Sequence, residues 1–293
     1  MKPQEFRYLR PRSLDEALQM LRASPEDVRP IAGGQSLVPM MSLRLAAPGT
    51  LLDLGGIGSL RGIRLEQDGT LVAGAMTTHS DFEHSELVRS KFPLLSAAME
   101  GVAHMPIRSR GTIGGSLAHA DPAGDWPALC VACDAQLVLS KLGSSRTVRA
   151  EDFACGIFST NLEPGELVTE VRFAPWPERR RWGHQKMTRR RGDFAIAGAV
   201  VLLDVDAGGC IECARIVIFG ATEMPVVVYE AAAHLVGSVP SVQHVEGILD
   251  VVTEAVEVRS DLHASAEYRR DLVRVMTRRA ILQALPELRG NHG

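Results

Sequence analysis

Apolar and polar residues follow helical spacing near the start of the chain and strand-like runs after it. Ser13 and Glu16 have the spacing of a capping box, so a helix is expected to begin there. The apolar residues that follow would share one helical face: Leu14, Ala17, Leu18 and Leu21. Short apolar runs then predict strands over residues 28–32, 50–54, 71–75 and 167–173.

Two hairpins and a long helix are expected farther along. The first hairpin joins residues 135–142 to 146–150 through a Gly-Ser-Ser turn. The second joins residues 195–206 to 213–219 across a turn that contains two glycines. The last helical pattern stops at Pro286. Its apolar face is predicted to hold Tyr268, Leu272, Val275, Met276 and Leu282.

A domain boundary is expected at the stretch Ala174-Pro175-Trp176-Pro177. Two prolines there cannot donate the backbone hydrogen bonds of a central strand. We therefore expect one domain over residues 1–176 and a second over 177–293, and 293 residues are enough for two cores. Because the second domain shows strands followed by helices, the expected fold class is α+β.

Composition and charge exclude some classes of protein. A formal net charge of -3 is unlike the basic balance of a nucleic-acid-binding protein. The longest uncharged apolar run, from Phe194 to Leu203, is too short to span a membrane. The first residues lack the apolar stretch of a signal peptide, and five cysteines without such a signal are typical of reduced thiols. A cytoplasmic protein with no membrane span is expected.

Two short glycine loops carry the candidate chemistry. The first is Ala32-Gly33-Gly34-Gln35-Ser36, and the second is Gly111-Thr112-Ile113-Gly114-Gly115-Ser116. Paired glycines allow successive backbone N–H groups to converge on one point, and such a nest binds anions. The hydroxyls of Ser36 and Thr112 would each add a hydrogen bond. A single Gly-Gly pair is usually an ordinary turn, but two such loops favour a pyrophosphate site.

Competing phosphate motifs are absent or incomplete. The chain contains no Gly-Lys dipeptide, so it has no Walker A loop. The run Gly56-Ile57-Gly58 follows a predicted strand, but Arg61 stands where the dinucleotide fingerprint needs its third glycine. A nicotinamide-type dinucleotide domain is therefore disfavoured.

The cysteines and histidines do not predict a metal site. Two cysteine pairs are too far apart for a compact zinc site and are expected to be core thiols: Cys130 with Cys133, and Cys210 with Cys213. Three polar residues after the second loop are expected to form turns or contact a ligand: His119, Asp121 and Asp125. The remaining candidates are expected on the surface or as satisfied core residues: His79, His84 and His104.

Both glycine loops lie inside longer motifs that resemble a known family. The motifs are Ile31-Ala32-Gly33-Gly34-Gln35-Ser36-Leu37-Val38-Pro39-Met40-Met41 and Ile107-Arg108-Ser109-Arg110-Gly111-Thr112-Ile113-Gly114-Gly115-Ser116-Leu117-Ala118-His119-Ala120-Asp121-Pro122. They resemble signatures of the FAD-binding medium subunits of the carbon monoxide dehydrogenase and xanthine dehydrogenase family. The resemblance covers nearly the whole chain. It implies a two-part FAD-binding domain, like that of vanillyl-alcohol oxidase, followed by a C-terminal antiparallel sheet with helices.

The resemblance also implies which residues contact FAD. Asp125 would meet the ribityl region, Lys186 would lie near the flavin, and Leu167 would be an apolar flavin contact. Gln35 stands where certain members have His and Ser116 where many have Asn, and both remain polar. The pyrophosphate would be held by the two loops: Ile31, Ala32, Gly33, Gly34, Gln35, Ser36, Thr112, Gly114, Gly115 and Ser116.

In this family the flavin is the electron exit of a larger enzyme. The resemblance implies a large subunit with a molybdenum cofactor, a small subunit with iron–sulfur clusters that feed electrons to FAD, and a dimer of heterotrimers. This chain lacks the cysteine runs that ligate such clusters, and no catalytic acid or base is expected on it. The alternative hypotheses are a degenerate scaffold subunit and a free-standing flavin oxidase. Substrates from carbon monoxide to purines, N-heterocycles and aldehydes stay open, as does the final electron acceptor.

Arginines are concentrated around Lys186, in the segment 179–191. They form two runs, Arg179 to Arg181 and Arg189 to Arg191. Two interpretations stay open: a solvated charged face, or a docking surface or positive field near the flavin phosphates.

Overall fold

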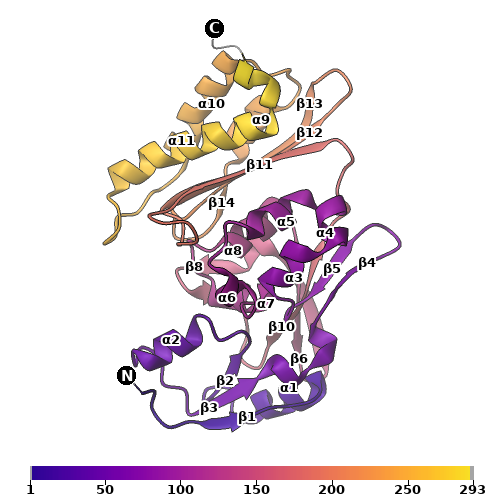
Figure 1. Ribbon diagram of the computed structural model, residues 1–293, viewed down its shortest axis with the longest axis vertical. Helices are drawn as coiled ribbons and strands as arrows, with labels where there is room; N and C mark the ends of the chain where they lie inside the picture. The colour runs from indigo at the N-terminus through magenta and orange to yellow at the C-terminus, as the bar shows by residue number, and fades with distance from the viewer. Residues whose placement is uncertain (1, 291–293) are drawn as a thin grey trace.

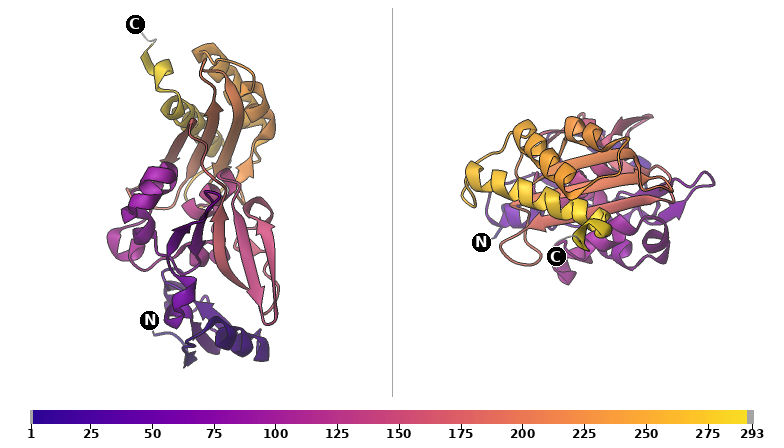
Figure 2. Two further views of the ribbon diagram at one scale, coloured as in Figure 1. Left: turned by 90° about the vertical axis from the view of Figure 1, so that its right-hand side faces the viewer. Right: turned by 90° about the horizontal axis from the view of Figure 1, so that it is seen from above.

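The computed structural model describes residues 2–290, and the fold is α+β, with its parts arranged along one long axis (Figure 1). The N-terminal residues form the lower part, the middle of the chain forms the central part, and the C-terminal sheet and helices form the upper part. Figure 2 shows the same elongated arrangement after a quarter turn. Within residues 2–290, no helix is both long and apolar enough to cross a membrane.

The lower part is a small parallel sheet with helices. Its strand order is β1-β3-β2, and both pairings are parallel. The helix predicted after Ser13 is present, and the Ser13 side chain accepts the N–H of Glu16 at 3.2 Å as an N-cap. The elements are β1 (Arg7–Leu9), α1 (Leu14–Ala23), β2 (Val28–Ile31), α2 (Leu37–Ser42), β3 (Thr50–Asp53), η1 (Leu54–Gly56) and η2 (Gly58–Leu60).

The central part is a five-stranded antiparallel sheet with helices packed against it. The strand order is β4-β5-β10-β6-β7, from β4 (Ile63–Leu65), β5 (Leu71–Gly74), β6 (Gln136–Lys141), β7 (Ser144–Arg149) and β10 (Leu167–Phe173). The helices and short elements are α3 (His79–His84), α4 (Glu86–Lys91), α5 (Pro93–Met99), α6 (Met105–Arg108), α7 (Ile113–His119), α8 (Asp125–Ala132), η3 (Ala150–Asp152), β8 (Ala154–Gly156) and β9 (Ser159–Thr160). Sheet and helices share one core, which contains Phe82, Phe92, Trp126 and Phe173.

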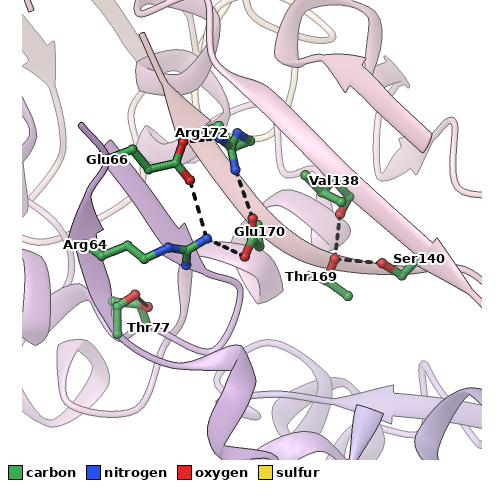
Figure 3. Close-up of polar contacts among 9 residues, drawn as sticks. Arg64, Glu66, Thr77, Val138, Ser140, Thr169, Glu170 and Arg172 are labelled. Atoms are coloured by element: carbon green, nitrogen blue, oxygen red, sulfur yellow. Dashed lines mark hydrogen bonds and ion pairs between the residues drawn. The ribbon is translucent and has the colours of Figure 1, made fainter. Parts of the chain in front are cut away.

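A bulge in β10 lies at Thr169, where the register against β6 shifts. The Thr169 hydroxyl contacts the carbonyl oxygen of Val138 at 3.1 Å and the hydroxyl of Ser140 at 2.9 Å (Figure 3). Its backbone carbonyl accepts the N–H of Ala75 at 2.9 Å, just beyond the end of β5.

Figure 3 also shows a half-exposed ion-pair network on this sheet, formed by Arg64, Glu66, Glu170 and Arg172.

The upper part is an antiparallel meander of four strands covered on one face by three helices (Figure 1). The strands are β11 (Arg180–Met187), β12 (Ala197–Val205), β13 (Ile211–Phe219) and β14 (Val226–Val227). The helical elements are α9 (Tyr229–Leu235), α10 (Val242–Ala255), α11 (Ala266–Ala284) and η4 (Pro286–Gly290).

Strand β12 is buried on both faces and links the upper and central parts. Val200 and Leu202 belong to the core of the central part, whereas Val201 and Leu203 belong to the core under the C-terminal helices. Alternate residues of a strand point to opposite faces, so the apolar run of β12 serves both cores.

The predicted strands are present, but two details of the hairpins differ. In the first, Ser144 and Ser145 belong to β7, and the turn is Leu142-Gly143, with Gly143 at φ +84°. A two-residue hairpin turn favours glycine at such a dihedral, so the turn lies earlier than predicted. In the second, β13 begins at Ile211 rather than Cys213.

Strand β11 was not predicted, because its sequence is rich in polar and charged residues. The other error concerns the face of α11: Tyr268 and Val275 are 47% and 39% exposed, while Val273 and Ala280 are fully buried. The helix packs closely on β11, since a Cβ built on Gly183 would lie 1.9 Å from the carbonyl oxygen of Ala280. The buried face of α11 is therefore set by the small residues Gly183 and Ala280. A helical face assigned from the positions of large apolar side chains does not include such residues.

Candidate functional site

The two glycine loops are in direct contact, although they belong to different parts of the fold. A Cβ built on Gly33 would lie 2.0 Å from the carbonyl oxygen of Arg110, so Gly33 packs against the peptide that opens the second loop. A Cβ built on Gly115 would lie 3.3 Å from the Cβ of Ala32. Residues predicted to act together are therefore side by side.

The first loop offers several uncommitted hydrogen-bond donors. In the described chain, no protein acceptor is found for the backbone N–H groups of residues 33 to 36. Gly34 has φ +73°, a dihedral that favours glycine. Ser36 precedes α2 without capping it, so its hydroxyl is free of that bond. The Gln35 side chain donates to the carbonyl oxygen of Gly33 at 3.1 Å and braces the loop instead of pointing away from it.

The second loop differs from the open nest that the sequence predicts. The N–H groups of Ile113 and Gly114 donate to the carbonyl oxygens of Thr77 and Ala75. The N–H of Gly115 donates to the Thr112 hydroxyl at 3.1 Å, as in an N-cap, and the N–H of Ser116 donates to the Thr112 carbonyl oxygen. Of the loop's amides, only that of Thr112 lacks an acceptor in the described residues.

The glycine at position 114 serves close packing. A Cβ built on Gly114 would lie 2.5 Å from the Cβ of Ala75 and 2.8 Å from its carbonyl oxygen. Ala75 is in turn held by the bulge at Thr169. The absence of a side chain at Gly114 thus allows the second loop to pack against the end of β5.

Asp125 and Lys186 form a buried ion pair between the central and upper parts. Lys186 Nζ lies 2.7 Å from Asp125 Oδ2, and the side chains are 10% and 6% exposed. His184, two residues before Lys186 on β11, brings Nε2 to 3.3 Å from Asp125 Oδ1, without hydrogen-bond geometry. Burial by itself raises the pKa of Asp125, but the charge of Lys186 and the contact with His184 outweigh it, so the pKa is lowered.

His184 was not identified from the sequence, although a signal existed. Residues two apart on a strand share a face, so once 180–187 is known to be a strand, His184 must lie beside Lys186. Its imidazole stacks on Phe219, with ring centroids 5.9 Å apart and an interplanar angle of 16°.

The other predicted contacts lie at the edge of this arrangement. Leu167 is 5% exposed and belongs to the core of the lower part. Ser116 lies in the first turn of α7 and is half-buried. Lys186 also approaches the turn after α5, since a Cβ built on Gly101 would lie 3.6 Å from Lys186 Cε.

The remaining candidates are structural, with one correction. Cys130 and Cys133 are buried core thiols as predicted, but Cys213 is exposed, and Cys210 is half-buried in the turn just before β13. Asp121 accepts the N–H of Ala123 in a turn. Within residues 2–290, no cluster of three or more metal-ligating side chains is present.

The structure divides the arginine-rich segment into two runs. Arg180 forms a bidentate ion pair with Asp204 at 2.6 and 2.8 Å, and Arg181 pairs with Glu287. These two arginines belong to β11 and stabilise the upper part. The second run, Arg189 to Arg191, is exposed on the loop after β11. That loop approaches the central part, because a Cβ built on Gly192 would lie 2.7 Å from the carbonyl oxygen of Ala103.

Comparison with known families agrees with this geometry. The family model described as the FAD binding domain in molybdopterin dehydrogenase matches residues 4–176. The model described as the CO dehydrogenase flavoprotein C-terminal domain matches residues 182–284. Together they cover both glycine loops, Asp125 and Lys186.

Individual relatives match over their whole length. The chain is 38% identical over 285 residues to the nicotine 6-hydroxylase medium subunit of Paenarthrobacter nicotinovorans, covering 97% of this chain and 99% of that protein. The solved carbon monoxide dehydrogenase of Hydrogenophaga pseudoflava superposes with a TM-score of 0.94 and 36% identity, over 98% of this chain and 99% of that one. Quinoline 2-oxidoreductase from Pseudomonas putida 86 gives a TM-score of 0.93 at 36% identity, with the same coverage. The chain therefore belongs to the FAD-binding medium subunits of the carbon monoxide dehydrogenase and xanthine dehydrogenase family of molybdenum hydroxylases.

Proposed function

We propose that this chain is the electron-exit subunit of a molybdenum hydroxylase. Its FAD takes electrons from iron–sulfur clusters of a small partner subunit and passes them to an external acceptor. A large partner subunit carries the molybdenum cofactor and the substrate pocket, and two such heterotrimers form the complete enzyme. The names of the relatives support this assignment, since they describe the medium subunit of a hydroxylase and the medium chain of a dehydrogenase.

The contact between the two glycine loops is the observation that carries the cofactor assignment. The uncommitted N–H groups of residues 33 to 36, the Thr112 N–H and the Ser36 hydroxyl are donors suited to a diphosphate. We assign the pyrophosphate contacts to Ile31, Ala32, Gly33, Gly34, Gln35, Ser36, Thr112, Gly114, Gly115 and Ser116. The first loop supplies most of the hydrogen-bond donors, and the second loop chiefly packs against the first.

The buried cluster on α8 and β11 suits the rest of the cofactor. Asp125 Oδ1 and His184 Nε2 are buried and lack hydrogen-bond partners among the described residues. Buried polar groups are normally satisfied, so a ribityl hydroxyl is a fitting partner for Asp125. Lys186 then provides a fixed positive charge near the flavin, and Leu167 an apolar contact. Bound flavin supplies the electron transfer, while these side chains position it and adjust its electronics.

The proposed cofactor site also suggests how the chain is divided into domains. We assign residues 1–176 to FAD binding and residues 177–293 to a C-terminal module that contributes Lys186. The two family models end and begin near this boundary, at residues 176 and 182. The substrate is set by another chain, because similar relatives are named for nicotine, caffeine and carbon monoxide.

The direct test is FAD content. The purified chain should be yellow and should release about one FAD per chain, as a single cofactor site requires. Gly33→Ala should lose FAD, because the new Cβ would overlap the Arg110 carbonyl. Gly58→Ala is the matched control, since a Cβ there meets nothing within 4 Å, and it should retain FAD. Colourless protein that gains no flavin spectrum with added FAD contradicts the proposal.

Purification together with partner chains separates the subunit from the two alternatives. A stable complex that reduces an acceptor through FAD supports the electron-exit role. Substrate turnover by the lone chain indicates a flavin oxidase, and a complex whose activity does not need the flavin of this chain indicates a scaffold.

A further inference from the structure

His79 is buried between the second glycine loop and helix α8. It is 5% exposed, and its Nδ1 accepts a 2.8 Å hydrogen bond from Nε1 of Trp126. On the other side of the ring, Nε2 is pressed against Gly111, where a built Cβ would lie only 2.6 Å away. Its backbone N–H donates to the Gly111 carbonyl oxygen at 3.0 Å. The imidazole therefore fills the space between Gly111 and Trp126.

Gly111 and Trp126, the two neighbours of the imidazole, both adjoin the proposed cofactor site. Gly111 belongs to the peptide on which Gly33 of the first loop packs. Trp126 is 1% exposed and follows Asp125, and its indole lies edge-on to Phe82 with ring centroids 4.4 Å apart. A movement of the imidazole would therefore displace the contact between the two glycine loops.

The hydrogen bond from Trp126 fixes the state of the imidazole. An indole N–H only donates, so Nδ1 must be unprotonated and the neutral ring carries its proton on Nε2. Burial lowers the pKa of His79 to about 4. Two charged groups also act on the ring: Asp125 on α8 raises its pKa, and Arg108 on α6 lowers it.

We propose that His79 is a positioning residue for FAD, whose neutral imidazole holds the second glycine loop against the first. The proposal rests on the proposed function, because it assigns the work of His79 to the same loops. Protonation would place an Nδ1–H opposite the indole N–H, so two donors would face each other in a buried site. The ring would then leave its place, and the support behind Gly111 would be lost.

The sign of the pH effect follows from the lowered pKa. Separation of the two loops would expose the imidazole to water, where its pKa has the ordinary value of 6.5. In the closed site its pKa is about 4, so the ring is protonated only at a much lower pH. FAD retention should therefore be constant above pH 6.5 and should weaken as the pH falls toward 4. The expected loss of affinity between pH 7 and pH 4 is about a hundredfold.

The experiment measures FAD release from the full-length, FAD-loaded chain between pH 7.5 and 4, by the 450 nm absorbance retained on a filter. His79→Gln offers an amide oxygen to Trp126 and does not titrate, so it should retain FAD at pH 7 and lose the acid-dependent release. His79→Leu leaves the indole N–H unpaired and should release FAD faster at every pH. Tryptophan fluorescence and melting temperature verify that both variants fold.

His84→Gln is the matched control, because His84 lies on the same helix but is exposed. It should behave as wild type at every pH. If His79→Gln releases FAD with the acid dependence of wild type, or if folded His79→Leu retains FAD as wild type does, His79 is not a positioning residue. If wild type and His84→Gln hold no FAD at pH 7, the proposed function itself is wrong.

Discussion

The ammonium of Lys186 lies 2.7 Å from the carboxylate of Asp125, so a strand of the C-terminal module neutralises a buried acid on a helix of the central part. Both side chains are at least nine-tenths buried. A charge in such a place is tolerated only with its partner. This ion pair therefore links the core of the central part to the core of the upper part, at the site that we propose for the flavin.

Replacing Lys186 with Met should destabilise the protein strongly, because Asp125 would be left buried and unpaired. The expected loss of unfolding free energy is about 3–5 kcal/mol. The double variant Asp125→Asn/Lys186→Met should recover part of it, since no charge remains. Urea unfolding of the FAD-free chain measures the effect without a contribution from cofactor binding.

Lys141→Met is the control for that experiment. Lys141 pairs with Glu163 at 2.8 Å, but the two side chains are 44% and 54% exposed. An exposed pair of this kind contributes about 0–1 kcal/mol. Equal losses for Lys186→Met and Lys141→Met would show that burial of the Asp125 pair has no energetic consequence.

The lowered pKa of Asp125 also predicts an acid-sensitive contribution to stability. A carboxyl group whose pKa is lower in the folded state stabilises the fold above its ordinary value of 3.8. That contribution is lost as the pH falls below 3.8 through the lower, folded-state pKa. Asp125→Asn/Lys186→Met should therefore lose less stability than wild type between pH 5 and pH 2, measured as the urea midpoint. Parallel pH curves for the two proteins contradict the prediction.

Gly114→Ala should loosen the second loop by collision with Ala75. Overpacking of this kind costs about 1–3 kcal/mol, and FAD content should fall with it. The double variant Gly114→Ala/Ala75→Gly removes the 2.5 Å contact between the two Cβ atoms and should recover part of both losses. Melting temperature and FAD per chain are the two measurements. No recovery in the double variant would mean that another contact makes glycine necessary at position 114.

The sequence was sufficient for elements whose apolar pattern is decided locally. The capped helix after Ser13 and the strand over 167–173 follow from caps and apolar runs, and the structure has both. Strand β11 was missed because its apolar content is low and its arginines are neutralised by residues far along the chain, such as Asp204 and Glu287. Pairing between distant segments cannot be inferred from a local pattern.

The candidate site, too, could be predicted from the sequence only in part. The sequence identified both glycine loops, and their contact agrees with a common role. It could not show that the amides of the second loop are occupied by Ala75 and Thr77, because those acceptors come from a segment more than thirty residues earlier. His184 was likewise missed, since its partner Asp125 is close only in the folded chain. His79 was expected on the surface or as a satisfied core residue, and it is a satisfied core residue whose partner, Trp126, could not be inferred from a local pattern.

Arg269→Met should destabilise the C-terminal module. The Arg269 side chain is 2% exposed and donates to the carbonyl oxygens of Ile196 and Gly220 at 2.5 and 2.6 Å. It also pairs with Asp261. Removing the guanidinium leaves two carbonyl groups unpaired, at least one of them in a buried contact, so a loss of about 3–5 kcal/mol is expected. Arg270→Met, one residue later on the exposed face, should change the urea midpoint little, and equal effects would contradict this role.

The five cysteines should differ sharply in their reactivity toward a maleimide at pH 7.5. The thiolate is the reactive form, so a thiol with a raised pKa reacts slowly even before access is considered. Burial raises the pKa of Cys133 to about 12 and raises that of Cys130 as well. Cys155 and Cys213 are exposed and should be labelled first, with half-buried Cys210 slower.

Peptide mapping by mass spectrometry of the folded chain, compared with the same chain in guanidinium chloride, distinguishes these sites. Cys130 and Cys133 should be modified only in the unfolded sample, because both are buried in the core of the central part, Cys130 on α8 and Cys133 at the C-terminal end of that helix. Labelling of Cys130 in the folded chain as fast as that of Cys155 would mean that α8 opens readily. Since α8 also carries Asp125 and Trp126, such opening would undermine both the buried ion pair and the support that His79 gives to the second loop.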